Sequence, residues 1–96
     1  MQDDDISARA AHEALLRALA RTADARRRQG RDAEAERLYQ RALDLAEDVF
    51  GSRHPEVAAM LTSLAALKDA RGERTEAEAL RRRVAEIRAE DDVAKN

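Results

Sequence analysis

Apolar residues recur at intervals of three and four residues in four segments of the chain, and this spacing predicts four amphipathic helices. The predicted helices cover residues 6–29, 32–50, 55–71 and 75–90. A glycine follows each of the first three, and glycine commonly closes a helix in the left-handed conformation. Asp3, Asp5 and Ser7 are expected to cap the first helix, and residues 91–96 are expected to fray. The pattern predicts an all-α fold of four antiparallel helices.

The residues that follow Gly30 resemble those that follow Gly72, which lies 42 positions further along the chain. The pairs that are identical at this offset are Glu34/Glu76, Ala35/Ala77, Glu36/Glu78, Leu38/Leu80 and Arg41/Arg83, with His12/His54, Leu19/Leu61 and Ala23/Ala65 upstream. A fixed period of this length indicates stacked structural repeats. A four-helix bundle is the alternative, but a bundle requires no sequence repeat. We therefore expect two stacked helical hairpins, at about 8–50 and 54–90, in one domain.

The interface between the two hairpins is expected to have Tyr39, Leu43, Leu61 and Leu64 at its centre. Of the residues counted as hydrophobic, 22 are alanines, which bury little area and let helices approach closely. Two alanine-rich repeats are expected to be only marginally stable alone, because solenoids need about three repeats or capping helices. The last helix carries Leu80, Val84 and Ile87 with no further helix after it. These residues are therefore predicted to form a homo-oligomer interface, most simply that of a dimer.

Charged residues make up 40% of the 96 residues, yet the net charge is only −2. Such mixed charge is typical of a solvated helical surface and gives no general attraction to nucleic acid or to anionic membranes. The chain has no cysteine, which excludes disulfides and thiolate chemistry. No apolar stretch approaches the roughly 18 residues that a membrane span needs, and the acidic N-terminus is unlike a signal peptide. These observations predict a cytoplasmic protein.

Residues at corresponding places in the two repeats resemble tetratricopeptide repeats of the 42-residue, kinesin-light-chain-like type. The matching residues are Ala23, Gly30, Ala35, Glu36, Leu38, Tyr39, Ala42 and Leu43 in the first repeat and Leu64, Ala65, Leu67, Gly72, Ala77, Glu78 and Leu80 in the second. The connector from Phe50 to Ala58 resembles the Gly-x-x-His-Pro-x-Val-Ala turn of that type. Lys68 and Arg26 stand where the family usually has an aromatic residue, and Arg81 replaces the counterpart of Tyr39. These departures weaken the second repeat or alter its packing surface.

The resemblance implies a short α-solenoid that binds a peptide or a helix of a partner protein in a groove lined by the first helix of each repeat. Carried over by position, the groove residues are Arg17, Arg21, Asp24, Arg28, Thr62, Ser63 and Asp69. The alternative for each of these residues is that it is simply exposed to solvent and contacts no partner. The asparagines that relatives use to hold a peptide backbone are replaced by hydroxyls at Thr62 and Ser63.

Catalytic and metal-binding chemistry finds little support in the sequence. His12 and His54 occupy equivalent places and are expected to cap helix starts or turns rather than to share a metal. The serines lack a nucleophile-elbow context, and each glycine is an isolated helix stop rather than part of a phosphate-binding loop. Consecutive arginines at 26–28 and 81–83 fan around a helix and cannot form one patch. No cofactor, metal or nucleic acid is expected.

The sequence thus favours a non-enzymatic protein-interaction module. The alternative is a self-assembling structural unit that oligomerises through its terminal helices. The identity of the partner and the relation of this chain to any longer repeat array are not encoded in these patterns.

Overall fold

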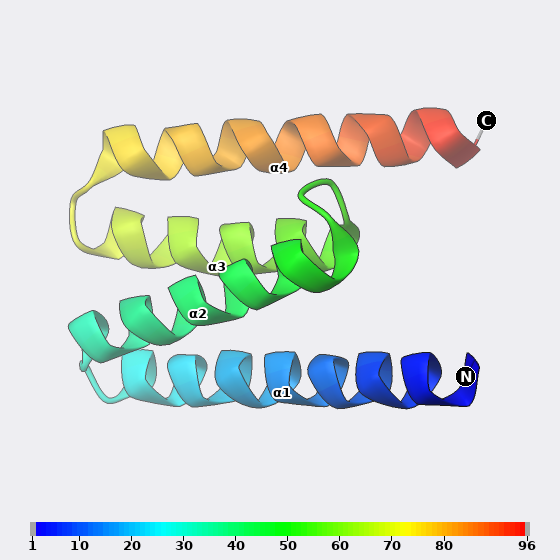
Figure 1. The fold of residues 1–96 in the computed structure, drawn as a ribbon. Helices are drawn as coiled ribbons and strands as arrows, with labels where there is room; N and C mark the ends of the chain where they lie inside the picture. Colours follow the sequence, from blue (N-terminus) through cyan, green and yellow to red (C-terminus); the bar gives the residue numbers. More distant parts are fainter. Residues whose placement is uncertain (1, 96) are drawn as a thin grey trace.

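The computed structural model describes residues 2–95, and the side chains of residues 7–93. Its four helices are α1 (Gln2–Arg28), α2 (Asp32–Phe50), α3 (Pro55–Ala70) and α4 (Arg74–Lys95). Figure 1 shows the helices side by side in chain order, each antiparallel to the next, so that α1 starts and α4 ends at the same edge. Between residues 2 and 95 no strand is present. The all-α prediction is confirmed.

The helices stack in chain order rather than closing into a bundle. The main packing contacts join α1 to α2, α2 to α3 and α3 to α4. The Cα positions extend over 47 × 32 × 16 Å, so the molecule is elongated and thin along one axis. A bundle would close its core by packing α1 against α4, whereas these two helices lie at opposite edges in Figure 1. Two stacked hairpins therefore describe the chain.

Small residues lie where the two helices of each hairpin approach one another. Ala23 and Ala35 are buried in the first hairpin, and their counterparts Ala65 and Ala77 are buried in the second. A larger side chain at these positions would push the helices apart, because packed interiors have little free volume. The four alanines thus set the spacing of both hairpins.

The expected centre of the inter-repeat interface is also buried. Tyr39 and Leu61 are fully inaccessible to solvent, and Leu43 and Leu64 are each only 4% exposed. All four residues belong to the same hydrophobic cluster, which extends from Leu16 to Ile87. One continuous core therefore links the two hairpins.

Gly30 and Gly72 end their helices with the same hydrogen-bond pattern. The Gly30 amide donates to the Arg27 carbonyl at 3.0 Å, and the Arg31 amide donates to the Arg26 carbonyl at 2.8 Å. The same two bonds recur 42 residues later, at 2.9 and 2.8 Å. This is the Schellman closure, which needs a residue with positive φ, and Gly30 and Gly72 have φ of 77° and 79°.

Replacing Gly72 with alanine is expected to lower the free energy of unfolding by about 1 kcal/mol, because a left-handed conformation is costly for a residue with a Cβ atom. A Cβ atom at this position meets no other atom within 4 Å, so the loss comes from the backbone alone. Urea unfolding followed by circular dichroism measures it. Gly72→Asn is the matched control and should lose less, because asparagine tolerates this conformation. Equal losses for both variants would contradict the explanation.

The outer ends of the chain differ from the sequence prediction. α1 begins at Gln2, so residues 3–5 and Ser7 lie within the helix rather than at its N-cap, and His12 lies in the helix interior rather than at a helix start. α4 continues through residues 91–95, which were expected to fray. In both stretches no proline or glycine interrupts the chain, and each contains alanine, which favours helix. Asn96 lies outside the described residues.

His54 caps α3, as expected. Its Nδ1 atom accepts a hydrogen bond from the Glu56 amide at 3.1 Å, and Pro55 occupies the first helical position. Proline suits this position because its φ is already helical and the first amides of a helix have no partner within it. The connector after Gly51 is therefore fixed at the start of α3.

Candidate functional site

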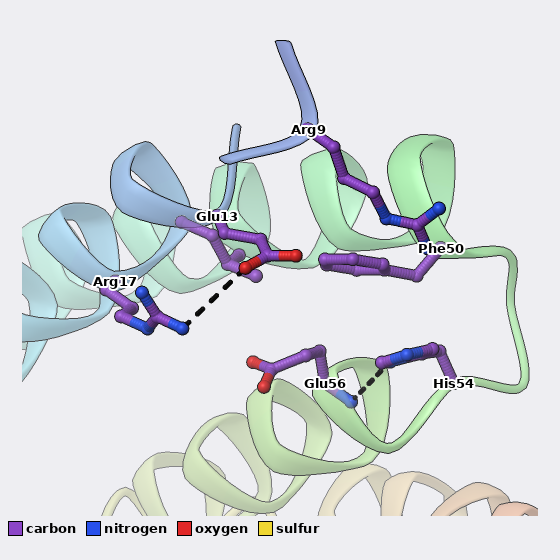
Figure 2. A pocket seen from close by; sticks show the side chains of 7 residues that line it. Arg9, Glu13, Arg17, Phe50, His54 and Glu56 are labelled. Carbon is purple, nitrogen blue, oxygen red and sulfur yellow. Dashed lines mark hydrogen bonds and ion pairs between the residues drawn. The ribbon is translucent and has the colours of Figure 1, made fainter. Parts of the chain in front are cut away.

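A hollow of about 160 Å³ lies where α1, the end of α2 and the start of α3 meet. We call it the α1–α3 hollow, and its lining residues are Arg9, Glu13, Leu16, Arg17, Phe50, His54 and Glu56. Figure 2 shows side chains of α1 on one side of the hollow and those of α3 on the other. The first helices of the two repeats thus face each other across a groove. Its lining combines apolar, cationic and anionic groups.

Aromatic and cationic side chains form one wall of the α1–α3 hollow. The rings of Phe50 and His54 are stacked with their centroids 4.4 Å apart, and the Arg9 guanidinium lies 5.1 Å from the Phe50 centroid (Figure 2). A cation over an aromatic face is attracted by the ring quadrupole. The stack joins the end of α2 to the start of α3 and gives the hollow an ordered wall.

Arg17, Arg21, Asp24 and Arg28 lie in one row along α1, since their spacing follows the helical period; we call this row the α1 stripe. Arg17 and Glu13 are 3.8 Å apart at the edge of the α1–α3 hollow. Asp24 and Arg28 line a second hollow with Arg27. All three arginines of the stripe are exposed. The stripe therefore presents mainly positive charge.

Asp24 is engaged by the core of the protein. The buried Tyr39 hydroxyl donates a hydrogen bond to the half-buried Asp24 carboxylate. Burial, together with this carboxylate, raises the pKa of Tyr39 to about 12. One oxygen of the Asp24 carboxylate is thus already occupied by a donor from the core of the protein.

The predicted groove residues of α3 are less closely gathered. Thr62 is exposed and its hydroxyl donates to the Ala58 carbonyl of its own helix at 2.8 Å. It lines a hollow between α3 and α4, whereas Asp69 pairs with Arg81 in another hollow and Ser63 is half-buried. None of these three residues lines the α1–α3 hollow or the hollow at Asp24 and Arg28. The positions that correspond to the stripe on α3 are Ala59, Ser63, Ala66 and Ala70, which are small and uncharged.

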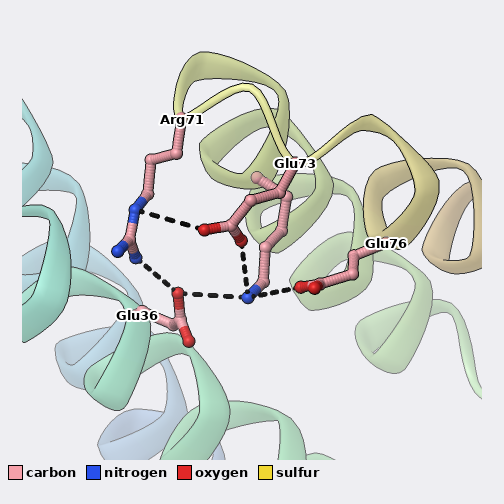
Figure 3. Close-up of polar contacts among 5 residues, drawn as sticks. Glu36, Arg71, Glu73 and Glu76 are labelled. Carbon is pink, nitrogen blue, oxygen red and sulfur yellow. Dashed lines mark hydrogen bonds and ion pairs between the residues drawn. The ribbon is translucent and has the colours of Figure 1, made fainter.

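Lys68 is the centre of an ionic cluster that sequence reasoning did not identify. Its ammonium group lies 3.3 Å from Glu36, 3.0 Å from Glu73 and 2.9 Å from Glu76, and Arg71 also contacts Glu36 at 2.7 Å (Figure 3). The side chain is only 15% exposed. These carboxylates raise the pKa of Lys68, and the lysine holds the pKa of Glu73 below its usual range. The cluster joins α2, α3 and α4 where the family usually places an aromatic residue.

Replacing Lys68 with methionine is expected to lower the free energy of unfolding at pH 7 by about 1 kcal/mol, because three carboxylates lose the cation that they share and Arg71 remains beside only Glu36 and Glu73. The depressed pKa of Glu73 means that its stabilising contribution is present above its usual pKa and is lost as pH falls below it. The difference between wild type and Lys68→Met should therefore shrink toward pH 3. Chemical unfolding across pH 3–8 measures this; a difference independent of pH would contradict the ionic explanation.

The premise that Leu80, Val84 and Ile87 stand uncovered is wrong. Val84 and Ile87 are 6% and 4% exposed, and Leu80 is partly buried against the same core. The apolar row of α4 is turned toward α3, its neighbour in the chain. An aspartate at Val84 or Ile87 would therefore disturb the core of a single chain. Little of these side chains is left for a second molecule, apart from Val84 at the edge of a hollow between α3 and α4.

Candidate metal ligands are not gathered in the described part of the molecule. Between residues 7 and 93 no group of three or more histidine, aspartate and glutamate side chains is placed to hold a metal ion. His12 is exposed on α1, while the ring of His54 is used in its cap and its stack. None of the described helices is both long and apolar enough to cross a bilayer.

Residues 14–90 match the tetratricopeptide repeat family, which is most of the chain. The chain belongs to this family. A segment of 44 residues is 39% identical to human "Tetratricopeptide repeat protein 19, mitochondrial". The matched segment covers 46% of this chain and 12% of that protein. The chain thus spans only a small part of this relative. Tetratricopeptide repeats generally mediate protein–protein interactions and are generally not catalytic.

The residues of the α1 stripe come from the family resemblance and stay a prediction as a binding site, whereas the α1–α3 hollow and the Lys68 cluster were not predicted. The hollow depends on Arg9, which lies before the clearest part of the repeat, and on the stacking of Phe50 with His54. A signal for the cluster was present, since Lys68 departs from the family pattern. Its partners lie on three elements, however, and only the fold brings them together.

Proposed function

We propose that this tetratricopeptide repeat chain is a non-enzymatic interaction module that binds an acidic peptide or helix of a partner protein. The partner lies along the α1 stripe, with one apolar side chain in the α1–α3 hollow. The proposal is supported above all by the contrast between the two first helices. α1 presents Arg17, Arg21 and Arg28, whereas the corresponding positions of α3 are Ala59, Ser63 and Ala70.

This contrast defines the chemistry of the partner. Arginine guanidinium groups bind carboxylates through paired hydrogen bonds, and Arg21 and Arg28 have no ionic partner among the described residues. Small side chains on α3 let a backbone approach closely. The half-buried Phe50 supplies apolar surface in the hollow, whereas Leu16 is only 2% exposed there. A segment with acidic residues toward α1 and an aliphatic side chain toward Phe50 fits both features.

We also propose the kinesin-light-chain-like type for these repeats. The support is the 42-residue spacing and the connector in which Gly51, His54 and Pro55 form the turn into α3. In the structure His54 caps the helix and stacks on Phe50, so the connector itself forms part of the α1–α3 hollow.

Affinity capture from a native lysate with quantitative mass spectrometry tests the proposal. A partner captured by the wild-type chain should be reduced at least about tenfold by Arg17→Glu or Arg21→Glu, because each charge reversal places like charges in contact. Arg37→Glu is the matched control, since Arg37 is an exposed arginine on α2. The control variant should capture the partner as the wild type does.

Equal loss for all three variants would show that capture follows general charge rather than the stripe, and would contradict the proposal. Retention of every captured protein by Arg17→Glu and Arg21→Glu would contradict it as well. Circular dichroism of each variant shows whether the fold is kept. We expect it to be kept, because all three arginines are exposed.

Self-assembly is the second candidate function. It is favoured by one observation: Arg81, Ala85 and Arg88 of α4 are exposed, although their counterparts in α2 are covered by α3.

A further inference from the structure

The two repeats can be compared position by position, and the comparison separates contacts within a repeat from contacts between repeats. Residues that are buried in α3 but exposed at the equivalent place in α1 are covered only by the preceding repeat. Val57 is fully buried while its counterpart Leu15 is 49% exposed, and Leu64 is buried while Thr22 is exposed. Met60 and Ala18 form a third such pair. We call Leu15, Ala18 and Thr22 the α1 end face.

The same comparison of α2 with α4 identifies the opposite end. Tyr39, Leu43 and Ala46 of α2 are buried, because α3 packs on them. Their counterparts in α4 are Arg81, Ala85 and Arg88, which are all exposed; we call them the α4 end face. They line a hollow of about 420 Å³ together with Thr62, Ala65 and Val84. This hollow lies where the first helix of a following repeat would pack.

We propose that the α4 end face takes the α1 end face of a second copy of this chain, in the register of the α2–α3 contact within one chain. The occupant is then an amphipathic helix that carries Leu15, Ala18 and Thr22 at the positions of Val57, Met60 and Leu64. The hollow between α3 and α4 has room for Leu15 or for its neighbour Leu19. The inference does not depend on the partner proposed for the α1 stripe.

Charge complementarity supports this register. Within the chain, Glu36 of α2 contacts Lys68 at 3.3 Å. The residues 42 positions away from these two are Glu78 and Arg26, so head-to-tail stacking places Glu78 of one copy beside Arg26 of the next. Arg26 already holds Glu34 at 3.8 Å, as Lys68 holds Glu76. Arg26 lacks two of the three carboxylates that surround Lys68: the counterpart of Glu73 is Arg31, and the counterpart of Glu36 is the one that a second copy would supply.

Head-to-tail contacts do not close on two molecules, because each added copy leaves one new face of each kind. The wild-type chain should therefore show an average mass that rises steadily above 10.7 kDa with concentration, rather than stopping at twice that value. Sedimentation equilibrium measures this average mass, and a protein concentration of up to about 1 mM is high enough to detect an interface with a Kd near 1 mM.

Two variants, each blocking one face, test the geometry. Leu15→Asp places a charge on the α1 end face, and Ala85→Glu places one in the hollow of the α4 end face; both positions are exposed, so the fold is kept. Each variant alone should remain at 10.7 kDa, because every contact needs both faces. An equimolar mixture should form a heterodimer and no larger species, since one intact face of each kind remains.

Glu78→Lys tests the register with Glu86→Lys as its control, because both are exposed glutamates of α4. Only Glu78→Lys should weaken assembly, by about tenfold in Kd. A wild-type chain that stays at 10.7 kDa throughout the series would overturn the proposal. A symmetric dimer that survives in either single-face variant would overturn it too, as would equal effects of the two charge reversals.

Discussion

Replacing Tyr39 with alanine is expected to lower the free energy of unfolding by about 4 kcal/mol, enough to leave much of this small protein unfolded at 25 °C. The Tyr39 side chain is fully buried at the contact of the two repeats. An alanine is too small to make the packing contacts of the ring. Its hydrogen bond to Asp24 is lost too. Circular dichroism during urea titration measures the change.

Tyr39→Phe is the matched control, because it keeps the ring and removes only the hydroxyl. It should lose about 1 kcal/mol at pH 7. The raised pKa of about 12 means that the tyrosine stabilises the fold fully below pH 10 and that this contribution is lost as pH rises through 12. The phenylalanine variant should lack this alkaline loss. An alkaline transition of equal size in both proteins would contradict the assignment to Tyr39.

Leu61→Ala is expected to destabilise the chain by about 3 kcal/mol, whereas the same substitution at Leu19 should cost about half as much. The two leucines occupy equivalent positions, 42 residues apart. Leu61 lies on α3, which packs between α2 and α4, and it is fully buried. Leu19 lies on α1, whose main packing contacts among the described residues are with α2, and it is partly buried.

The pair measures what the second neighbour contributes, since the chemistry of the two substitutions is identical. Midpoints and slopes from denaturant titrations give both free energies. Equal losses at the two positions would show that burial at the repeat junction does not distinguish them, and would contradict the stacked arrangement.

The sequence predicts the inner part of this fold well because the repeat encodes it twice. Gly30 and Gly72 fix the two tight turns, and α2 begins and ends where its apolar row does. The outer ends are predicted less well. Nothing in residues 2–12 or 91–95 stops a helix, so both terminal helices continue beyond the repeat, although no internal copy indicates their length.

The error at Val84 and Ile87 has a physical reason. A helix with a single apolar row buries that row against its own hairpin partner first, and only additional apolar residues are left for a second neighbour. In α2 this second set is Tyr39 and Leu43; in α4 it is replaced by Arg81 and Ala85. The ionic cluster at Lys68 and the stack of Phe50 with His54 depend on tertiary contacts, which a single sequence does not reveal.

The central claim is that a partner binds in the groove formed by α1 and the start of α3. The most direct measurement is a two-dimensional ¹⁵N NMR titration of the full chain with the acidic segment of a captured partner. We predict shift changes in residues 13–28 and in the connector around Phe50 and His54, with the outer surface of α2 unchanged. Changes confined to α2 or α4, or none at saturating peptide, would contradict the account.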